Sequence, residues 1–185
     1  FIMSANNNMP RMMKAFQQMS TYYGGDGPDI FGHAQKLLPT EDVLGQLDPL
    51  VLRDTAKVGY RDQALVGLGQ DISIGEFSVE YAKQLDDEKL FIYLQTLKGV
   101  GPKLAQCIML YGYHRMASFP IDVWIKRIMV KLYSLEGKSN KFIAEFAQNR
   151  FGAYAGFAQQ LLFMYARTHR EIFDKTCILP KDGVE

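Results

Sequence analysis

The chain has few cysteines and no long apolar run, and both absences limit what it can be. Two cysteines, Cys107 and Cys177, are too few for a disulfide framework, and no Cys or His pair has the close spacing of a zinc or iron–sulfur site. No stretch approaches the roughly 20 apolar residues of a membrane-spanning helix, and the first residues lack the order of a signal peptide. We therefore expect an intracellular protein, away from membranes, that holds no metal through its side chains.

Length and composition fit a globular protein of one or two domains, since 48% of the 185 residues are hydrophobic and 22% are charged. The chain begins on Phe1 rather than Met, so we expect it to be a piece of a longer protein. The net charge is only +1, but the charges are unevenly distributed. Residues 40–97 hold five Lys and Arg against eleven Asp and Glu, whereas residues 98–150 hold nine against three. The basic part of the chain thus begins at residue 98.

Almost nothing in the sequence alternates as a β-strand does, and helix breakers recur at short intervals. The Gly-rich stretch "YYGGDGPDIFGH" predicts a loop to about residue 34. Proline at first-turn positions and Asp122 at a cap position mark helix starts. The sequence therefore predicts an all-α bundle. Its expected helices cover approximately residues 10–20, 40–47, 49–56, 61–70, 77–84, 87–97, 102–113, 122–133, 139–150 and 153–169.

The stretch "LKGVGPKLA" has the form of a helix-hairpin-helix motif, which we place at about residues 88–113. Gly99 and Gly101 allow positive φ and leave no side chain between the backbone and an approaching phosphate, while amides at the next helix start can hold an anion. An ordinary turn between two helices explains a Gly-x-Gly pattern equally well on its own. The apolar residues on both sides of the glycines favour the phosphate-binding motif.

Lys103 stands in the first turn of the second helix, where the helix dipole makes a cation locally unfavourable. An ε-amine that is desolvated or close to positive charge holds its proton less tightly and can act as a nucleophile, so beside a nucleotide it could attack a sugar carbon. Such a lysine needs a carboxylate to stabilise the cationic sugar and move protons, and Asp122 in "FPIDVWIKRIM" is the candidate. Asp122 is also a typical N-cap, and both roles are compatible because a capping carboxylate has a fixed position.

The segments "GVGPKLAQC" and "FPIDVW" together resemble the HhH-GPD DNA glycosylases, and the lysine makes the chain similar to their 8-oxoguanine DNA glycosylase/lyases. "FIMSANNNMPR", "GYRDQA" and "FGAYAGFAQQLLF" match the same family, so the resemblance runs from residue 1 to about residue 167. It implies one all-α glycosylase region over residues 1–185 that excises 8-oxoguanine opposite cytosine and then cleaves the abasic strand. The N-terminal antiparallel β domain of the family would lie before Phe1, and we expect it to be absent from this chain.

The resemblance also implies roles for single residues. Lys103 would attack C1′ of the sugar and form a Schiff base, and Asp122 would stabilise the sugar cation. Backbone at Gly99, Val100 and Gly101 would hold phosphate and, through its carbonyls, a monovalent cation. The remaining implied roles are an orphan-cytosine site of Asn6, Arg11 and Arg61, a duplex wedge of Tyr60, and a base pocket of Gln159, Phe163 and Cys107.

The partner that the resemblance implies is double-stranded DNA containing oxidised guanine. The enzyme would act as a monomer in a bacterial cytoplasm or nucleoid or in a eukaryotic nucleus. It would have no iron–sulfur cluster, because the four clustered cysteines of endonuclease III-like relatives are missing from the chain. The resemblance departs from animal members of the family at Trp124, where they place a histidine.

Residue chemistry agrees with these roles, but it also fits plainer ones. Guanidinium donors suit the N3 and O2 acceptors of cytosine, and an amide could read a purine stacked on Phe163, which shares a helix face with Gln159. Without the family match, the same residues would serve as helix caps, solvated charges and core positions. Two other functions stay open: an alkyl-base glycosylase of the same superfamily, and a non-catalytic DNA-binding module. Lys103 and Asp122 together argue against the second.

Overall fold

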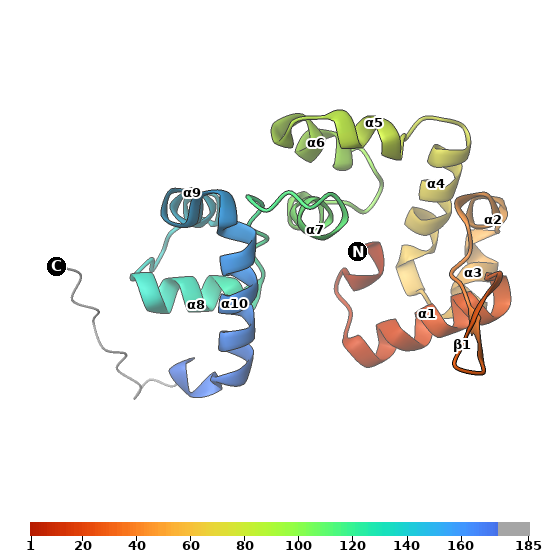
Figure 1. The fold of residues 1–185 in the computed structure, drawn as a ribbon, viewed down its shortest axis with the longest axis horizontal. Helices are drawn as coiled ribbons and strands as arrows, with labels where there is room; N and C mark the ends of the chain where they lie inside the picture. Colours follow the sequence, from red (N-terminus) through yellow and green to blue (C-terminus); the bar gives the residue numbers. More distant parts are fainter. Residues whose placement is uncertain (174–185) are drawn as a thin grey trace. The chain divides into compact units, whose positions relative to one another are not determined.

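The computed structural model describes residues 1–173, so Cys177 lies outside the described part of the chain. Helices dominate it, as Figure 1 shows, and the predicted all-α architecture is confirmed. The chain divides into two compact units, Phe1–Leu104 and Ala105–Glu185, here unit 1 and unit 2. Within the described residues no helix has the length and apolar character needed to cross a membrane.

Most helices of unit 1 begin at polar caps. Asn8 Oδ1 accepts the Arg11 amide at 3.0 Å, and Asp48 accepts two amides of the helix that follows it. Because these amides have no partner within the helix, the caps fix where each helix starts. The helices are α1 (Met9–Tyr23), α2 (Glu41–Gln46), α3 (Pro49–Ala56), α4 (Asp62–Ser73), α5 (Val79–Gln84) and α6 (Asp87–Leu94), with the 3₁₀ turns η1 (Ile2–Ser4) and η2 (Gly59–Arg61).

The segment after α1 contains two antiparallel strands, β1 (Asp26–Ile30) and β2 (His33–Lys36). The prediction of a loop to about residue 34 is therefore wrong for this hairpin. Phe31 and Gly32 both have positive φ and make its tight turn. All strand residues except Gly27 are exposed, so neither face has to be apolar, and no alternating pattern marks the strands in the sequence.

Close helix packing in unit 1 supports the hairpin that precedes Lys103. Helices α2 and α4 approach so tightly that a Cβ on Gly69 would lie 2.5 Å from the Gly45 nitrogen. On α4, Ala64 faces the hairpin, since a Cβ on Gly99 would lie 3.1 Å from the Ala64 Cβ. Small residues thus let α4 pack between α2 and the hairpin backbone.

Unit 2 is built from three helices around one apolar core. Helix α7 (Pro102–Gly112) begins in the last residues of unit 1 and continues into unit 2. The other helices and turns are α8 (Val123–Tyr133), α9 (Asn140–Phe151), η3 (Gly152–Tyr154), α10 (Ala155–Thr168) and η4 (Arg170–Phe173). The core side chains of α8, α9 and α10 have no solvent exposure; they are Ile125, Ile128, Met129, Ile143, Ala147, Ala155 and Ala166. This core holds the start of α8 and the inner face of α10 in place.

Candidate functional site

The hairpin has the geometry of a backbone cradle. Leu97 and Val100 are buried, and the Val100 amide donates to the Leu97 carbonyl at 3.1 Å, which closes the turn. Gly99 has a φ of 84°, so the predicted use of its conformational freedom is confirmed. Gly101 does not have positive φ, and its missing side chain matters differently: a Cβ there would meet nothing within 4 Å. The backbone at Gly101 is therefore open to an approaching group.

Lys103 is exposed in the first turn of α7, directly after this hairpin. Its side chain forms no hydrogen bond or ion pair with any described residue. Lys98, on the same hairpin, differs because its Nζ donates to Gln63 Oε1 at 2.8 Å. The amine of Lys103 is therefore available to an external partner, whereas that of Lys98 already has one within the chain.

Asp122 is the N-cap of α8, as predicted from the sequence. Its Oδ1 accepts the Ile125 amide at 2.8 Å. Among the described residues, no group donates to Oδ2. One carboxylate oxygen thus fixes the side chain, and the other can face a substrate.

Gln159 binds the loop that leads to Asp122. It is 5% exposed on α10, and its Nε2 donates to the Pro120 carbonyl at 3.0 Å, two residues before Asp122. Its Oε1 accepts from the neighbouring Gln160 side chain. Phe163, one turn later on the same helix, is half-buried against the core of unit 2. The two residues therefore share a helix face, as predicted, and Gln159 also anchors the loop that carries the cap.

Tyr111 is a candidate residue that sequence reasoning missed. Burial raises the pKa of its phenol, and the nearby charges of Cys107 and Asp122 raise it further. Cys107, which is half-buried, and the phenol both lie on α7, one turn apart. The i, i+4 spacing of Cys107 and Tyr111 can be read from the sequence. The proximity of Asp122 to Tyr111 comes only from the fold. The phenol is thus a neutral hydrogen-bonding group beside the predicted catalytic carboxylate at neutral pH.

The raised pKa of Tyr111 predicts a stability change at alkaline pH. A folded-state pKa above the unfolded value stabilises the fold below about pH 10, and this contribution is lost as the pH rises through the folded pKa. We expect the free energy of unfolding of the wild type to fall more steeply above pH 10 than that of Tyr111→Phe. Urea titrations of both proteins at pH 8 and pH 11 measure the difference. If the free energy of unfolding changes with pH equally in both proteins, the pKa of Tyr111 is not raised in the folded state.

Arg61 is buried and binds the segment before α1. Only 4% of the residue is exposed, although it carries a charge. Its Nε donates to the Ala5 carbonyl at 3.0 Å, Nη2 to the Ala5 and Asn6 carbonyls, and Nη1 to the Val58 carbonyl at 3.1 Å. The guanidinium thus ties together chain segments that are 56 residues apart. Most of its donors are used within unit 1.

Asn6 and Tyr60 lie at the Arg61 contacts, and Arg11 belongs to the same unit. Asn6 is exposed and has a φ of 46°, an uncommon backbone conformation that the Arg61 contact to its carbonyl holds. Tyr60 is 62% exposed, its hydroxyl donates to the Ala5 carbonyl, and its ring lies 4.4 Å from the Arg61 guanidinium carbon. Arg11 is exposed in the first turn of α1. The residues predicted to contact an orphan base are thus gathered in unit 1.

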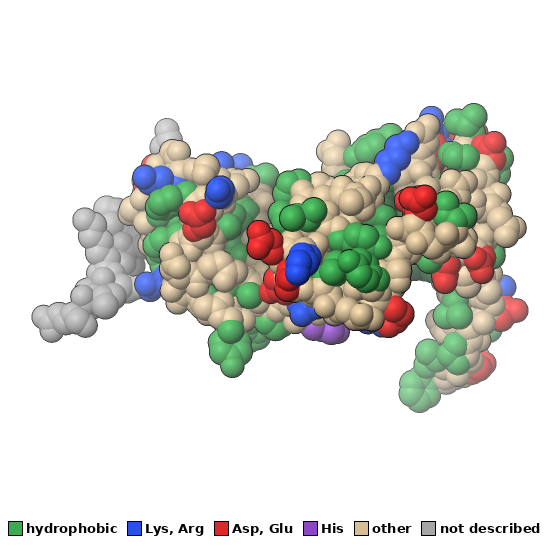
Figure 2. All heavy atoms as spheres, turned by 90° about the horizontal axis from the view of Figure 1, so that it is seen from above, with side chains coloured by type: hydrophobic (Ala, Val, Ile, Leu, Met, Phe, Trp, Pro, Cys, Tyr) green, Lys and Arg blue, Asp and Glu red, His purple; other side chains and the backbone are tan. Residues whose placement is uncertain are grey.

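Exposed basic side chains lie in unit 2, which also carries Asp122, Gln159 and Phe163. Figure 2 shows Lys and Arg side chains spread over its surface. On α8, at the end of α10 and in η4, they include Lys126, Arg127, Lys131, Arg167 and Arg170. This distribution agrees with the basic sequence that begins at residue 98.

In the described part of the chain, no group of three or more His, Cys, Asp or Glu residues is placed to hold a metal ion.

Comparison with known sequences gives consistent relatives, although no family model matches the chain. The N-glycosylase/DNA lyase OGG1 of Arabidopsis thaliana is 30% identical over 175 residues, which is 89% of this chain and 47% of that protein. A probable N-glycosylase/DNA lyase of Methanothermobacter thermautotrophicus is 36% identical over 110 residues, 60% of this chain and 35% of that protein. The chain therefore spans between about a third and about half of the length of these curated relatives.

Among solved structures, the 8-oxoguanine glycosylase/lyase of Clostridium acetobutylicum is similar to this chain with a TM-score of 0.84 and 35% sequence identity. That structure contains double-stranded DNA with cytosine opposite 8-oxoguanine. The superposition covers 91% of this chain and 58% of the other. Sequence and structure comparisons thus agree on the same group of proteins, and the resemblance inferred from the motifs is confirmed.

Proposed function

This chain is a homologue of the 8-oxoguanine glycosylase/lyases of the HhH-GPD superfamily, and from that premise we propose that it excises 8-oxoguanine opposite cytosine from duplex DNA and then cleaves the abasic strand. The observation that supports this most is Lys103, an exposed amine without a partner among the described residues, directly after a hairpin whose backbone is open at Gly101. The ligand of such a hairpin is a phosphate of the DNA strand, held by amide groups.

The chemistry follows from an amine and a carboxylate. Lys103 Nζ attacks C1′, the glycosidic bond breaks, and the base leaves with the bonding electrons. The attached nitrogen then gives up a proton, and the C1′–O4′ bond breaks as O4′ takes up a proton, which leaves the opened sugar as a protonated Schiff base. This Schiff base makes a C2′ proton acidic, and loss of that proton breaks the C3′–O3′ bond and releases the 3′ phosphate. Asp122 stabilises the positive charge that develops on the sugar, which its second carboxylate oxygen can do while the first caps α8. Lys103 belongs to unit 1 and Asp122 to unit 2, and the one glycosylase region expected for residues 1–185 includes both units.

The base pocket and the orphan-base site carry specificity in this proposal. The ring of Phe163 would stack on the flipped purine, and the amide of Gln159 would bind its pairing edge. Cys107 would line the same pocket with a polarisable side chain. Asn6 and Arg11 contact the orphan cytosine, together with Arg61, and Tyr60 enters the duplex as a wedge. The exposed ring of Tyr60 fits that role.

A monovalent cation at the hairpin carbonyls is a further part of the proposal. Carbonyl oxygens suit such an ion, and the backbone around Gly101 is open. The carbonyls of Gly99, Val100 and Gly101 would hold it, and its charge would favour a nearby phosphate. No step of the reaction passes through the cation. The enzyme would act on DNA as a monomer. Its location would be the compartment that holds the DNA of the cell.

Incubation with duplexes that carry 8-oxoguanine opposite each of the four bases tests the proposed function. With cytosine opposite the lesion, we expect base release, a cut strand, and a covalent protein–DNA adduct when borohydride is present. A matched duplex with 3-methyladenine distinguishes the alkyl-base glycosylase. Binding of DNA with neither base release nor an adduct would instead indicate a non-catalytic module.

The orphan-base site predicts a preference of at least about tenfold for cytosine over adenine, because adenine places an amino donor against a guanidinium and leaves a donor unpaired. Arg61→Ala should reduce this ratio. It should also lower the free energy of unfolding by about 1–3 kcal/mol, since the carbonyls of Asn6 and Val58 lose the Arg61 guanidinium as their donor. Single-turnover excision opposite each base and thermal unfolding measure the two effects.

Arg11→Ala is the matched control for this prediction. The Arg11 side chain is exposed and has no hydrogen bond with any described residue, so its removal should change stability by about 0.5 kcal/mol or less. A fall in the cytosine preference would then report direct reading of the base. If the wild type cuts equally opposite all four bases, Asn6, Arg11 and Arg61 do not form an orphan-base site.

A further inference from the structure

Three arginines of unit 2 surround one indole ring. The guanidinium carbons of Arg127, Arg167 and Arg170 lie 5.8, 5.7 and 5.7 Å from the centre of the Trp124 ring. They come from α8, from the end of α10 and from η4. Phe173 packs on the same indole with a ring separation of 5.9 Å. Trp124 thus gathers the positive charge of Arg127 on its own helix with those of Arg167 and Arg170 from a later part of the chain; these arginines and Trp124 are here the arginine cluster.

These charges have no acidic partner within the described residues. None of the three arginines takes part in an ion pair or hydrogen bond there, and all three are exposed. Like charges around one ring repel each other, and stacking on the indole offsets this only in part. Because their N–H groups have no acceptor among the described residues, the guanidinium groups remain available to an anion.

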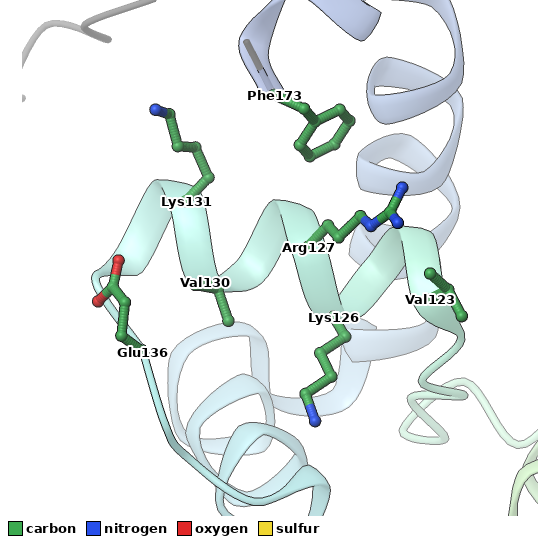
Figure 3. A pocket seen from close by; sticks show the side chains of 7 residues that line it. All are labelled: Val123, Lys126, Arg127, Val130, Lys131, Glu136 and Phe173. Carbon is green, nitrogen blue, oxygen red and sulfur yellow. The ribbon is translucent and has the colours of Figure 1, made fainter. Parts of the chain in front are cut away.

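A cavity adjoins the arginine cluster. It has a volume of about 620 Å³, and Arg127, Lys126, Lys131 and Phe173 are among its lining residues. Figure 3 shows Arg127 extending from α8 toward α10, with the ring of Phe173 beside it. Glu136 is the one acidic residue in the lining that the structure describes. The cavity walls are therefore predominantly basic where they meet the cluster.

The arginine cluster is continuous with the proposed base pocket. The Arg167 guanidinium carbon lies 5.7 Å from the centre of the Trp124 ring and 5.6 Å from that of Phe163. Trp124 itself follows Asp122 by two residues, in the first turn of α8. An anion at the cluster would thus lie next to the residues proposed to receive the flipped nucleotide.

We propose that the arginine cluster around Trp124 binds phosphate groups of the DNA strand beside the flipped nucleotide. Planar guanidinium groups pair with phosphate oxygens through two parallel hydrogen bonds, which matches the free edges of these side chains. The inference rests on the proposed function, because that function places DNA at Asp122 and Phe163. It adds a second set of phosphate contacts, made by side chains rather than by hairpin backbone.

The salt dependence of DNA binding tests this site. A duplex with a tetrahydrofuran abasic analogue has no base to excise, so binding is measured without chemistry. For Arg127→Gln and Arg167→Gln, we expect the slope of log Kd against log salt concentration to fall in magnitude by about one each. Arg150→Gln is the matched control, because Arg150 stacks alone on Tyr133 at 5.0 Å, and it should keep the wild-type slope.

A charge-conserving variant separates phosphate contact from folding. Arg167→Lys should retain most of the slope, because the charge stays although the planar group is lost. Wild-type slopes in Arg127→Gln and Arg167→Gln would overturn the proposal. A loss in Arg167→Lys as large as that in Arg167→Gln would also overturn it, since the charge would not be the cause.

A second measurement does not depend on DNA repair activity. Trp124 is the only tryptophan of the chain, so its fluorescence reports on the cluster. Inorganic pyrophosphate should change the emission of the wild type and of Arg150→Gln at constant ionic strength, and should not change that of the Arg127→Gln, Arg167→Gln double variant. No response in the wild type would overturn the anion site. A change in Trp124 emission in a protein that excises no base would contradict the proposed function and would still support the anion site.

Discussion

Lys103→Gln should abolish the covalent adduct that borohydride traps on 8-oxoguanine duplex and should reduce base release by about 100-fold or more. The substitution removes the nitrogen that is proposed to attack C1′ and keeps a polar side chain of similar length. Lys103 is exposed and has no partner in the part of the chain that the structure describes, so the free energy of unfolding should change by about 0.5 kcal/mol or less. Gel analysis of trapped adducts, with thermal unfolding beside it, measures both quantities.

Lys98→Gln is the matched control on the same hairpin. It removes a charge of the same sign five residues earlier in the chain, and Lys98 has an internal partner in Gln63. We expect this variant to trap an adduct at nearly the wild-type rate, with DNA binding weakened by the loss of one positive charge. An adduct of wild-type yield from Lys103→Gln would show that another amine is trapped. Equal losses in both variants would point to phosphate binding rather than nucleophilic attack.

The elements that local chemistry determines could be predicted from the sequence. Asn8 and Asp122 cap α1 and α8, and Gly99 takes up the positive φ of the hairpin, because caps and turns depend on a few neighbouring residues. The β1–β2 hairpin could not be predicted in this way. Its strands are exposed on both faces, so burial imposes no alternation on them, and the glycines suggest a loop.

The contacts that position the site are long-range, and the sequence does not show them. Gln159 donates to a carbonyl 39 residues earlier, and Arg61 to one 56 residues earlier. The family resemblance indicated both residues as base contacts. The fold adds that Gln159 binds the backbone two residues before Asp122 and that Arg61 binds the backbone carbonyl of Asn6. The arginine cluster around Trp124 likewise exists only once α8, α10 and η4 have packed.

Asp122→Asn should slow base excision by about 100-fold or more while leaving the protein folded. The asparagine Oδ1 can accept the Ile125 amide as the carboxylate does, so the free energy of unfolding should change by roughly 1 kcal/mol or less. The variant has no negative charge to oppose the cation that develops on the sugar, and loss of such stabilisation has an effect of this size. Single-turnover release of 8-oxoguanine and thermal unfolding measure the two changes separately.

Asp122→Ala completes the comparison, because it removes the cap together with the charge. It should lose a further 1 kcal/mol or so of stability relative to Asp122→Asn, yet excise at a similarly reduced rate. On a duplex with a preformed abasic site, the base has already gone, so the Asn variant should lose less of its strand-cleaving rate than of its excision rate. If Asp122→Asn instead excises at the wild-type rate and only Asp122→Ala is impaired, the carboxylate acts through the cap of α8, and the charge that stabilises the sugar must come from another residue.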